Sequence, residues 1–171
     1  MFKKLIIGND HGGVETKRMI VSYLQEKGYE VVNAGSDSDQ IVRYPYYAAK
    51  VAGAVSSGEA DGGILICSTG IGMSMVANKF KGVRASVCTS HYMAKMTRRH
   101  NNSNVLCLGG KITGPFEILD ILQAWLENEY EEGRHAISLA MLQQEEECLL
   151  NNSTWQPEKD LMLNDGGVRS D

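Results

Sequence analysis

Short apolar runs alternate along this chain with longer segments in which apolar residues recur every three or four positions. The short runs are typical of buried strands and the longer pattern is typical of amphipathic helices. The runs predict strands at residues 4–8, 29–34, 63–67, 83–88 and 105–108. The longer segments predict helices at residues 14–26, 46–57, from within 68–72 to about 80, 90–100, 114–130 and 135–149.

Alternating strands and helices imply βαβ units, and therefore an α/β fold with a parallel sheet that helices cover on both faces. The 171 residues suffice for one ordinary domain with its own core. We expect this domain to span residues 1–149. Residues 150–171 are polar and glycine-rich, and we expect them to form a C-terminal tail.

Polar and reactive residues follow the predicted strands. In parallel sheets, ligands bind beyond the carboxyl ends of the strands. The segments expected at those ends are Asn9–His11, Cys67–Gly70, Cys88–Ser90 and Gly109–Lys111. The sequence therefore predicts a site at this edge of the sheet.

Cys67 ends an apolar run and precedes Ser-Thr-Gly-Ile-Gly, which opens a predicted helix. Free amides and the helix dipole at such a place favour a thiolate and can also bind an oxyanion. A base next to a charge stabiliser is what an enediolate intermediate needs. A buried, purely structural cysteine is the alternative, and residue type alone favours it.

Three further segments carry candidate chemistry, each with a structural alternative. Asp10 and His11 can bind sugar hydroxyls and a phosphate, or serve as a helix N-cap with a solvated histidine. His100, at a helix end rich in cations, can donate a proton to a ring oxygen or belong to a helix C-cap. Arg134 can bind a phosphate or be solvated, and Lys111 lies nearer the sheet.

Composition narrows the class of protein. A net charge of −4 argues against binding nucleic acid or an anionic membrane, and 43% hydrophobic residues are typical of a globular protein. The N-terminus does not resemble a signal peptide and nothing approaches a membrane span, so a cytoplasmic protein is expected. Four cysteines without a CxxC pair make a zinc site improbable, and neither GxGxxG nor GxxxxGK[ST] occurs.

Together these segments resemble a known family. The order GNDHGG, RYPYYA, SGEADGGILICSTGIGMSMVANK, GVRA, RRHNNSNVLCLGG and EYEEGRH is similar to type B ribose-5-phosphate isomerase and its relatives, the galactose-6-phosphate isomerase subunits and allose-6-phosphate isomerase. The similarity covers roughly residues 3–148. It implies a three-layer αβα Rossmann-like sandwich with a five-stranded parallel sheet. It also implies a homodimer or homotetramer with shared active sites, with neither metal nor organic cofactor.

The resemblance also implies roles for individual residues in aldose–ketose isomerisation of a sugar phosphate. Cys67 matches the base, while Thr69 and His100 match groups that assist ring opening. The matching substrate-binding residues, which hold the enediolate, the sugar or the phosphate, are Asp10, His11, Tyr44, Ser68, Gly70, Ile71, Gly72, Asn101, Lys111 and Arg134.

Two departures from the family pattern leave the substrate open among C4, C5 and C6 sugar phosphates. Ser68 stands where the family usually has glycine, and Ser138 stands where a second phosphate-binding arginine is usual. These changes would also suit a non-catalytic phosphosugar-binding protein or a regulatory subunit of a hetero-oligomer. A flavodoxin-like nucleotide or flavin module is a third alternative. The presence of both Cys67 and His100 favours the enzyme.

Overall fold

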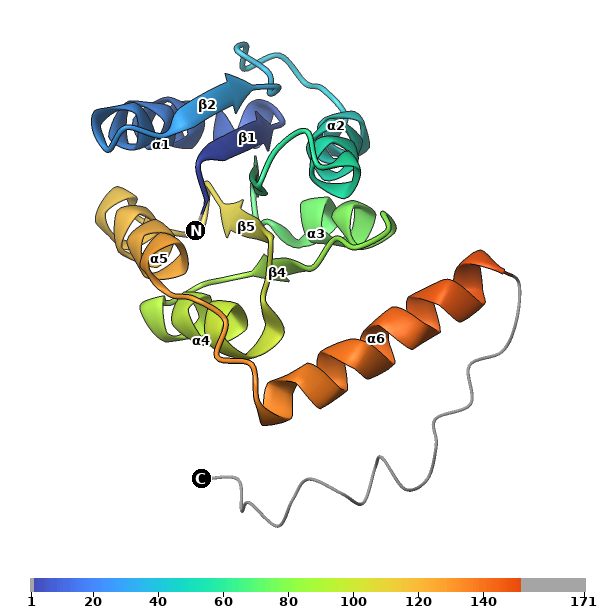
Figure 1. Ribbon diagram of the computed structural model, residues 1–171. Helices are drawn as coiled ribbons and strands as arrows, with labels where there is room; N and C mark the ends of the chain where they lie inside the picture. Colours follow the sequence, from blue (N-terminus) through green and yellow to red (C-terminus); the bar gives the residue numbers. More distant parts are fainter. Residues whose placement is uncertain (1, 152–171) are drawn as a thin grey trace. The chain divides into compact units, whose positions relative to one another are not determined.

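The computed structural model describes residues 2–151, and its strands and helices alternate as the sequence predicts (Figure 1). The strands are β1 (Lys4–Asn9), β2 (Glu30–Asn33), β3 (Gly62–Cys67), β4 (Ala85–Val87) and β5 (Val105–Gly109). The helices are the 3₁₀ turn η1 (His11–Gly13), then α1 (Val14–Glu26), α2 (Tyr44–Ser57), α3 (Ile71–Ala77), α4 (His91–Asn101), α5 (Pro115–Glu127) and α6 (Arg134–Leu150). The predicted α/β class is confirmed.

All strand pairs are parallel, and the sheet has the order β2-β1-β3-β5-β4. The chain first moves outward from β1 to β2, then returns to place β3 on the other side of β1. The direction of winding therefore reverses between β1 and β3. In open parallel sheets, a crevice forms at such a reversal, beyond the carboxyl ends of the two strands.

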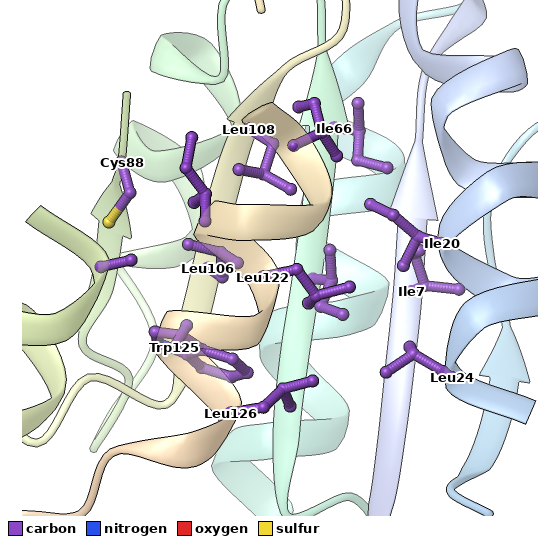
Figure 2. Close-up of a cluster of buried hydrophobic side chains, with 14 of the residues drawn as sticks. Ile7, Ile20, Leu24, Ile66, Cys88, Leu106, Leu108, Leu122, Trp125 and Leu126 are labelled. Atoms are coloured by element: carbon purple, nitrogen blue, oxygen red, sulfur yellow. The ribbon is translucent and has the colours of Figure 1, made fainter. Parts of the chain in front are cut away.

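Alternate residues of each strand point to opposite faces of the sheet, so one apolar run supplies two cores. Ile64 and Ile66 of β3 pack with α1, α4 and α5, in the core that Figure 2 shows around Leu122 and Trp125. Leu65 and Cys67, also of β3, pack on the other face with α2 and α3. The expected three-layer αβα sandwich follows from this alternation.

Two predicted boundaries were wrong near β4. The helix that was expected to reach residue 80 ends at Ala77, and the strand expected over 83–88 covers only Ala85–Val87. The side chain of Asn78, the C-cap residue of α3, bonds the first residue of β4: its Oδ1 accepts from the N–H of Ala85 at 2.8 Å, and its Nδ2 donates to the C=O of Ala85 at 2.9 Å. These bonds link the end of the helix to the start of the strand.

The chain divides into two compact units, with the boundary between Glu129 and Tyr130. The first unit contains the sheet and helices α1–α5. The second contains α6, close to the helix predicted over 135–149. The predicted tail lies almost entirely outside the described residues, so the division at residue 149 stays a prediction. Among the described residues, every helix falls short of the length or apolar character that a membrane span requires.

Candidate active site

The crevice between β1 and β3 brings together the segments that the sequence predicts there. The backbone N–H of Asp10 bonds Ile66 O at 3.2 Å, which ties the end of β1 to β3. On the other side, the N–H of Lys111 bonds Ser68 O at 3.1 Å, which ties the end of β5 to β3. Asp10, Ser68 and Lys111 thus lie at one edge of the sheet, next to Cys67.

Cys67 is the last residue of β3, and its side chain is 6% exposed on the face that α2 and α3 cover. Its Sγ accepts a hydrogen bond from the N–H of Gly70, with an N···S distance of 3.1 Å. An amide N–H in this place can stabilise negative charge that develops on the sulfur during a reaction. Gly70 can aim its N–H in this way because it has a φ of +79°, and its Cα lies against the backbone of Leu108.

Other thiols in the core differ from Cys67 in their surroundings. Burial raises the pKa of Cys88 to about 12. Burial, with smaller effects of Cys88 and Cys67, raises the pKa of Cys107 well above its ordinary value. Both therefore stay protonated near neutral pH. In contrast to these two, Cys67 has a backbone N–H donor to its sulfur.

Asp10 and His11 form the start of η1. Asp10 is buried, and its Oδ1 accepts a hydrogen bond from the N–H of Gly12 at 2.8 Å, so it is the N-cap that one interpretation predicts. His11 Nδ1 accepts a hydrogen bond from the N–H of Val42 at 3.3 Å. His11 is therefore not simply solvated, because the loop before α2 holds one ring nitrogen.

A cavity of about 720 Å³ lies beside His11 and Lys111. Its volume falls within the range of about 300–1,000 Å³ that is usual for small-ligand pockets. The start of α1, the loop 37–39 and Gly110 complete its wall, where Arg18 adds a third basic side chain and Glu15, Asp37 and Asp39 add three acidic ones. The described residues that line the cavity do not include Cys67. The cavity thus adjoins His11 and Lys111, and its wall carries both basic and acidic side chains.

The turn after Cys67 is compact. Ile71 N–H bonds Thr69 Oγ1 at 3.4 Å, and the first helical bond of α3 runs from Ser74 N–H to Gly70 O at 3.1 Å. The ring of Tyr44 lies against Gly72, where an added Cβ would come within 2.9 Å of ring atoms. Tyr44 at the start of α2 is therefore brought to the same turn.

His100 and Asn101 lie at the opposite edge of the sheet. Their helix, α4, begins after the carboxyl end of β4 and ends just before β5 begins. The chain next to it, at Asn104, bonds Gly63 at the start of β3. A strand of six residues spans about 20 Å. One copy of the chain therefore does not bring His100 or Asn101 to Cys67.

Arg98 precedes them and has a structural role. Its guanidinium is buried and lies over the rings of Phe2 and Trp125, with distances from Cζ to the ring centroids of 4.6 and 5.6 Å. It also bonds the carbonyl of Ser103. Arg134, the remaining predicted phosphate ligand, begins α6 in the second unit.

The sequence analysis missed Lys17, whose side chain is 2% exposed. Its Nζ bonds Ser36 O at 2.6 Å and Asp37 Oδ1 at 2.5 Å. A signal was present, because Lys17 lies at helical spacing on the buried stripe of α1, with Val14, Ile20 and Leu24. A lysine on an apolar stripe predicts a specific partner for its charge.

Comparisons with known proteins agree with this fold and these motifs. The model of the ribose/galactose isomerase family matches residues 5–142. Ribose-5-phosphate isomerase B of Escherichia coli is 49% identical over 133 residues, which cover 78% of this chain and 89% of that protein. The solved structure of ribose-5-phosphate isomerase B of Clostridium thermocellum has a TM-score of 0.84 and 46% identity, over 85% of this chain and 99% of that one. D-erythrulose-4-phosphate isomerase of Pectobacterium atrosepticum is 40% identical, over 77% of this chain and 88% of that protein.

Proposed function

The chain belongs to the ribose/galactose isomerase family, and we propose that it interconverts the aldose and ketose forms of a phosphorylated sugar, with ribose 5-phosphate and ribulose 5-phosphate as the first pair. One observation carries the proposal. A cysteine at the carboxyl end of the central strand has a backbone N–H aimed at its sulfur, at the edge of the sheet where His11 and Lys111 line a cavity. The names of the relatives support the reaction class. The erythrulose-4-phosphate relative leaves a C4 phosphate as a further candidate, and the galactose in the family's description leaves a C6 phosphate.

In the proposed reaction, the Cys67 thiolate removes the proton from carbon 2 of the open-chain aldose. The electron pair forms the carbon–carbon double bond of an enediolate, and the negative charge moves to the former carbonyl oxygen. Amides of the turn Gly70–Gly72 hold that charge. The hydroxyl proton on the carbon-2 oxygen passes to the carbon-1 oxygen, which becomes a hydroxyl. Cys67 then returns the carbon-bound proton to carbon 1, and the oxygen on carbon 2 becomes the ketose carbonyl. Positioned proton transfer contributes about 10²–10⁴-fold, and one oxyanion donor about 10²–10³-fold.

Other residues position the sugar in this proposal. Asp10 and Tyr44 contact its hydroxyls, and Ser68 borders the reacting end. His11 and Lys111 hold the phosphate in the cavity, since both line it. Arg134 is a further phosphate ligand that the family pattern implies. Thr69 and His100 assist ring opening, and Asn101 supports the enediolate.

We infer a homodimer or homotetramer, because His100 and Asn101 lie about a strand length from Cys67 in one chain. A second copy would supply these two residues to the crevice. The proposed setting is the cytoplasm, where the thiol of Cys67 stays reduced. No metal or organic cofactor is needed for the proposed proton transfer.

The test is an assay of ketose formation from C4, C5 and C6 aldose phosphates, with and without EDTA. We expect turnover of at least one substrate, unchanged by the chelator, from a protein that sedimentation shows to be dimeric or larger. Phosphosugar binding without ketose formation would favour a non-catalytic subunit instead. Loss of activity on chelation would contradict the metal-free mechanism.

A further inference from the structure

Lys17 is buried in the first unit, although lysine is almost never fully buried without a partner. Removing an ammonium group from water costs several kcal/mol, so an apolar residue here would often be no less stable. Its two bonds, to Ser36 O and Asp37 Oδ1, are charge-assisted and short. The side chain therefore holds a defined piece of backbone rather than filling a gap in the core.

The backbone that Lys17 holds is the base of residues 34–43, here called the Ser36 loop. Ser36 O accepts a second hydrogen bond from Asn9 Nδ2 at 3.0 Å, and Ser36 N–H donates to Asn9 O at 3.1 Å. Asn33 Nδ2 adds a bond of 3.2 Å to Asp37 Oδ1. Beyond Asp37 the loop is mostly exposed, so these contacts at its base are its principal attachment to β1 and α1.

The far end of the Ser36 loop reaches two residues of the candidate site. Val42 N–H donates to His11 Nδ1, which leaves that nitrogen as the acceptor and places the ring proton on Nε2. The loop then enters α2 at Tyr44, whose ring lies against Gly72. The loop's base is thus attached by Lys17, and its end sets the orientation of His11 and the position of Tyr44.

We propose that Lys17 is a positioning residue, which fixes the Ser36 loop so that His11 Nε2 and the Tyr44 ring face the substrate. The effect on substrate binding rests on the proposed function, whereas the effect of Lys17 on the Ser36 loop does not. Lys17 touches no substrate. A loop displaced by as little as about 1 Å can cost up to about 10²-fold in catalysis, because the residues it orients lose their geometry.

The test compares Lys17→Met, Lys17→Arg and the wild type, with Lys27→Met as the matched control. Lys27 is the C-cap residue of the same helix, α1, but its side chain is exposed. Hydrogen exchange reports the loop, and steady-state kinetics with the active sugar phosphate report the site. In Lys17→Met we expect loop amides to exchange at least about tenfold faster while β3 amides are unchanged. We expect KM to rise about tenfold with kcat within about threefold, since His11 and Tyr44 bind substrate.

Lys17→Arg should recover part of both effects, and Lys27→Met should match the wild type. Wild-type loop exchange in Lys17→Met, or faster exchange with unchanged KM, would overturn the inference. An inactive wild-type protein would overturn the proposed function instead, while the exchange result still decides what Lys17 holds. Where Lys17→Met does not fold, loop exchange in Asp37→Ala decides, because Asp37 is exposed. Exchange alone is used for this variant, since Asp37 also lines the cavity and its loss would change KM directly. Faster exchange of the loop amides supports the inference, and wild-type exchange overturns it.

Discussion

Replacing Cys67 by alanine separates its chemical role from its structural one. The sulfur is almost fully buried and accepts one backbone hydrogen bond. Its removal leaves the N–H of Gly70 without that acceptor, at a cost of about 1–3 kcal/mol, and leaves a small cavity. This loss is smaller than the total stability of about 5–15 kcal/mol of a typical domain, so the variant should fold.

The effect on catalysis should be much larger than the effect on stability. Loss of the base should lower kcat by about 10²–10⁴-fold, which corresponds to about 3–5 kcal/mol of activation free energy. The assay is ketose formation from the best sugar phosphate of the panel, with urea unfolding measured in parallel. Cys67→Ala should therefore lose activity while keeping a cooperative unfolding transition.

Cys107→Ala is the matched control. Cys107 packs on the same face of the sheet, one strand away, and is fully buried. Its removal should cost a similar amount of stability and leave kcat within about threefold. Activity of Cys67→Ala within about threefold of the wild type would refute the role of the thiol. Equal loss in both variants would show that the cavity, rather than the missing base, is responsible.

Three further expectations follow from the same geometry. Gly70→Ala should lower the free energy of unfolding by about 2 kcal/mol or more and remove most of the activity, because a φ of +79° is strained for alanine and the added Cβ meets backbone atoms at 3.1 Å. The control is Gly28→Ala, which has a φ of +84° but open space around the added Cβ and should keep the wild-type kcat. Two backbone hydrogen bonds, from the N–H groups of Lys4 and Lys3, hold the pKa of Asp61 below its ordinary value of 3.8. The charged carboxylate of Asp61 should stabilise the fold by about 1 kcal/mol or less at this exposed site. This contribution should be complete at pH values well above 3.8 and disappear as the pH falls through the lowered pKa. Urea unfolding curves of the wild type and Asp61→Asn should therefore converge between pH 6 and pH 2. Iodoacetamide at pH 8 should inactivate the protein in step with alkylation of Cys67, and mass spectrometry should show Cys88, with its pKa of about 12, unmodified. A stability difference between wild type and Asp61→Asn that persists at low pH would contradict the account of Asp61. Inactivation that follows alkylation of Cys88 would contradict the account of Cys67.

The layers of the fold could be predicted because each strand is a short apolar run. The run 63–67 gave a correct strand because residues on both of its faces are buried. The strand order could not be predicted in this way, since it depends on which strands pair. The boundaries near β4 were missed because a hydrophobic pattern does not report where helical bonds stop or where strand pairing starts. It also does not report a side-chain link such as the bonds from Asn78 to Ala85.

The candidate site could be predicted in part. Asp10, Cys67 and Lys111 lie at or just after the carboxyl ends of parallel strands, so strand geometry alone brings them to one edge. His100 ends a helix that returns to the other edge, and the same reasoning places it away from Cys67. Lys17 needed a different argument, because its partners come from a polar loop whose path no periodicity describes.

The most direct test of the proposed reaction is isomerisation of ribose 5-phosphate in D₂O, followed by NMR over many turnovers. A proton carried by one protein group exchanges with solvent in a fraction of turnovers. We therefore predict ribulose 5-phosphate with deuterium accumulating at carbon 1. Ketose that stays free of deuterium after many turnovers, or no ketose from any C4, C5 or C6 aldose phosphate, would contradict proton transfer through Cys67.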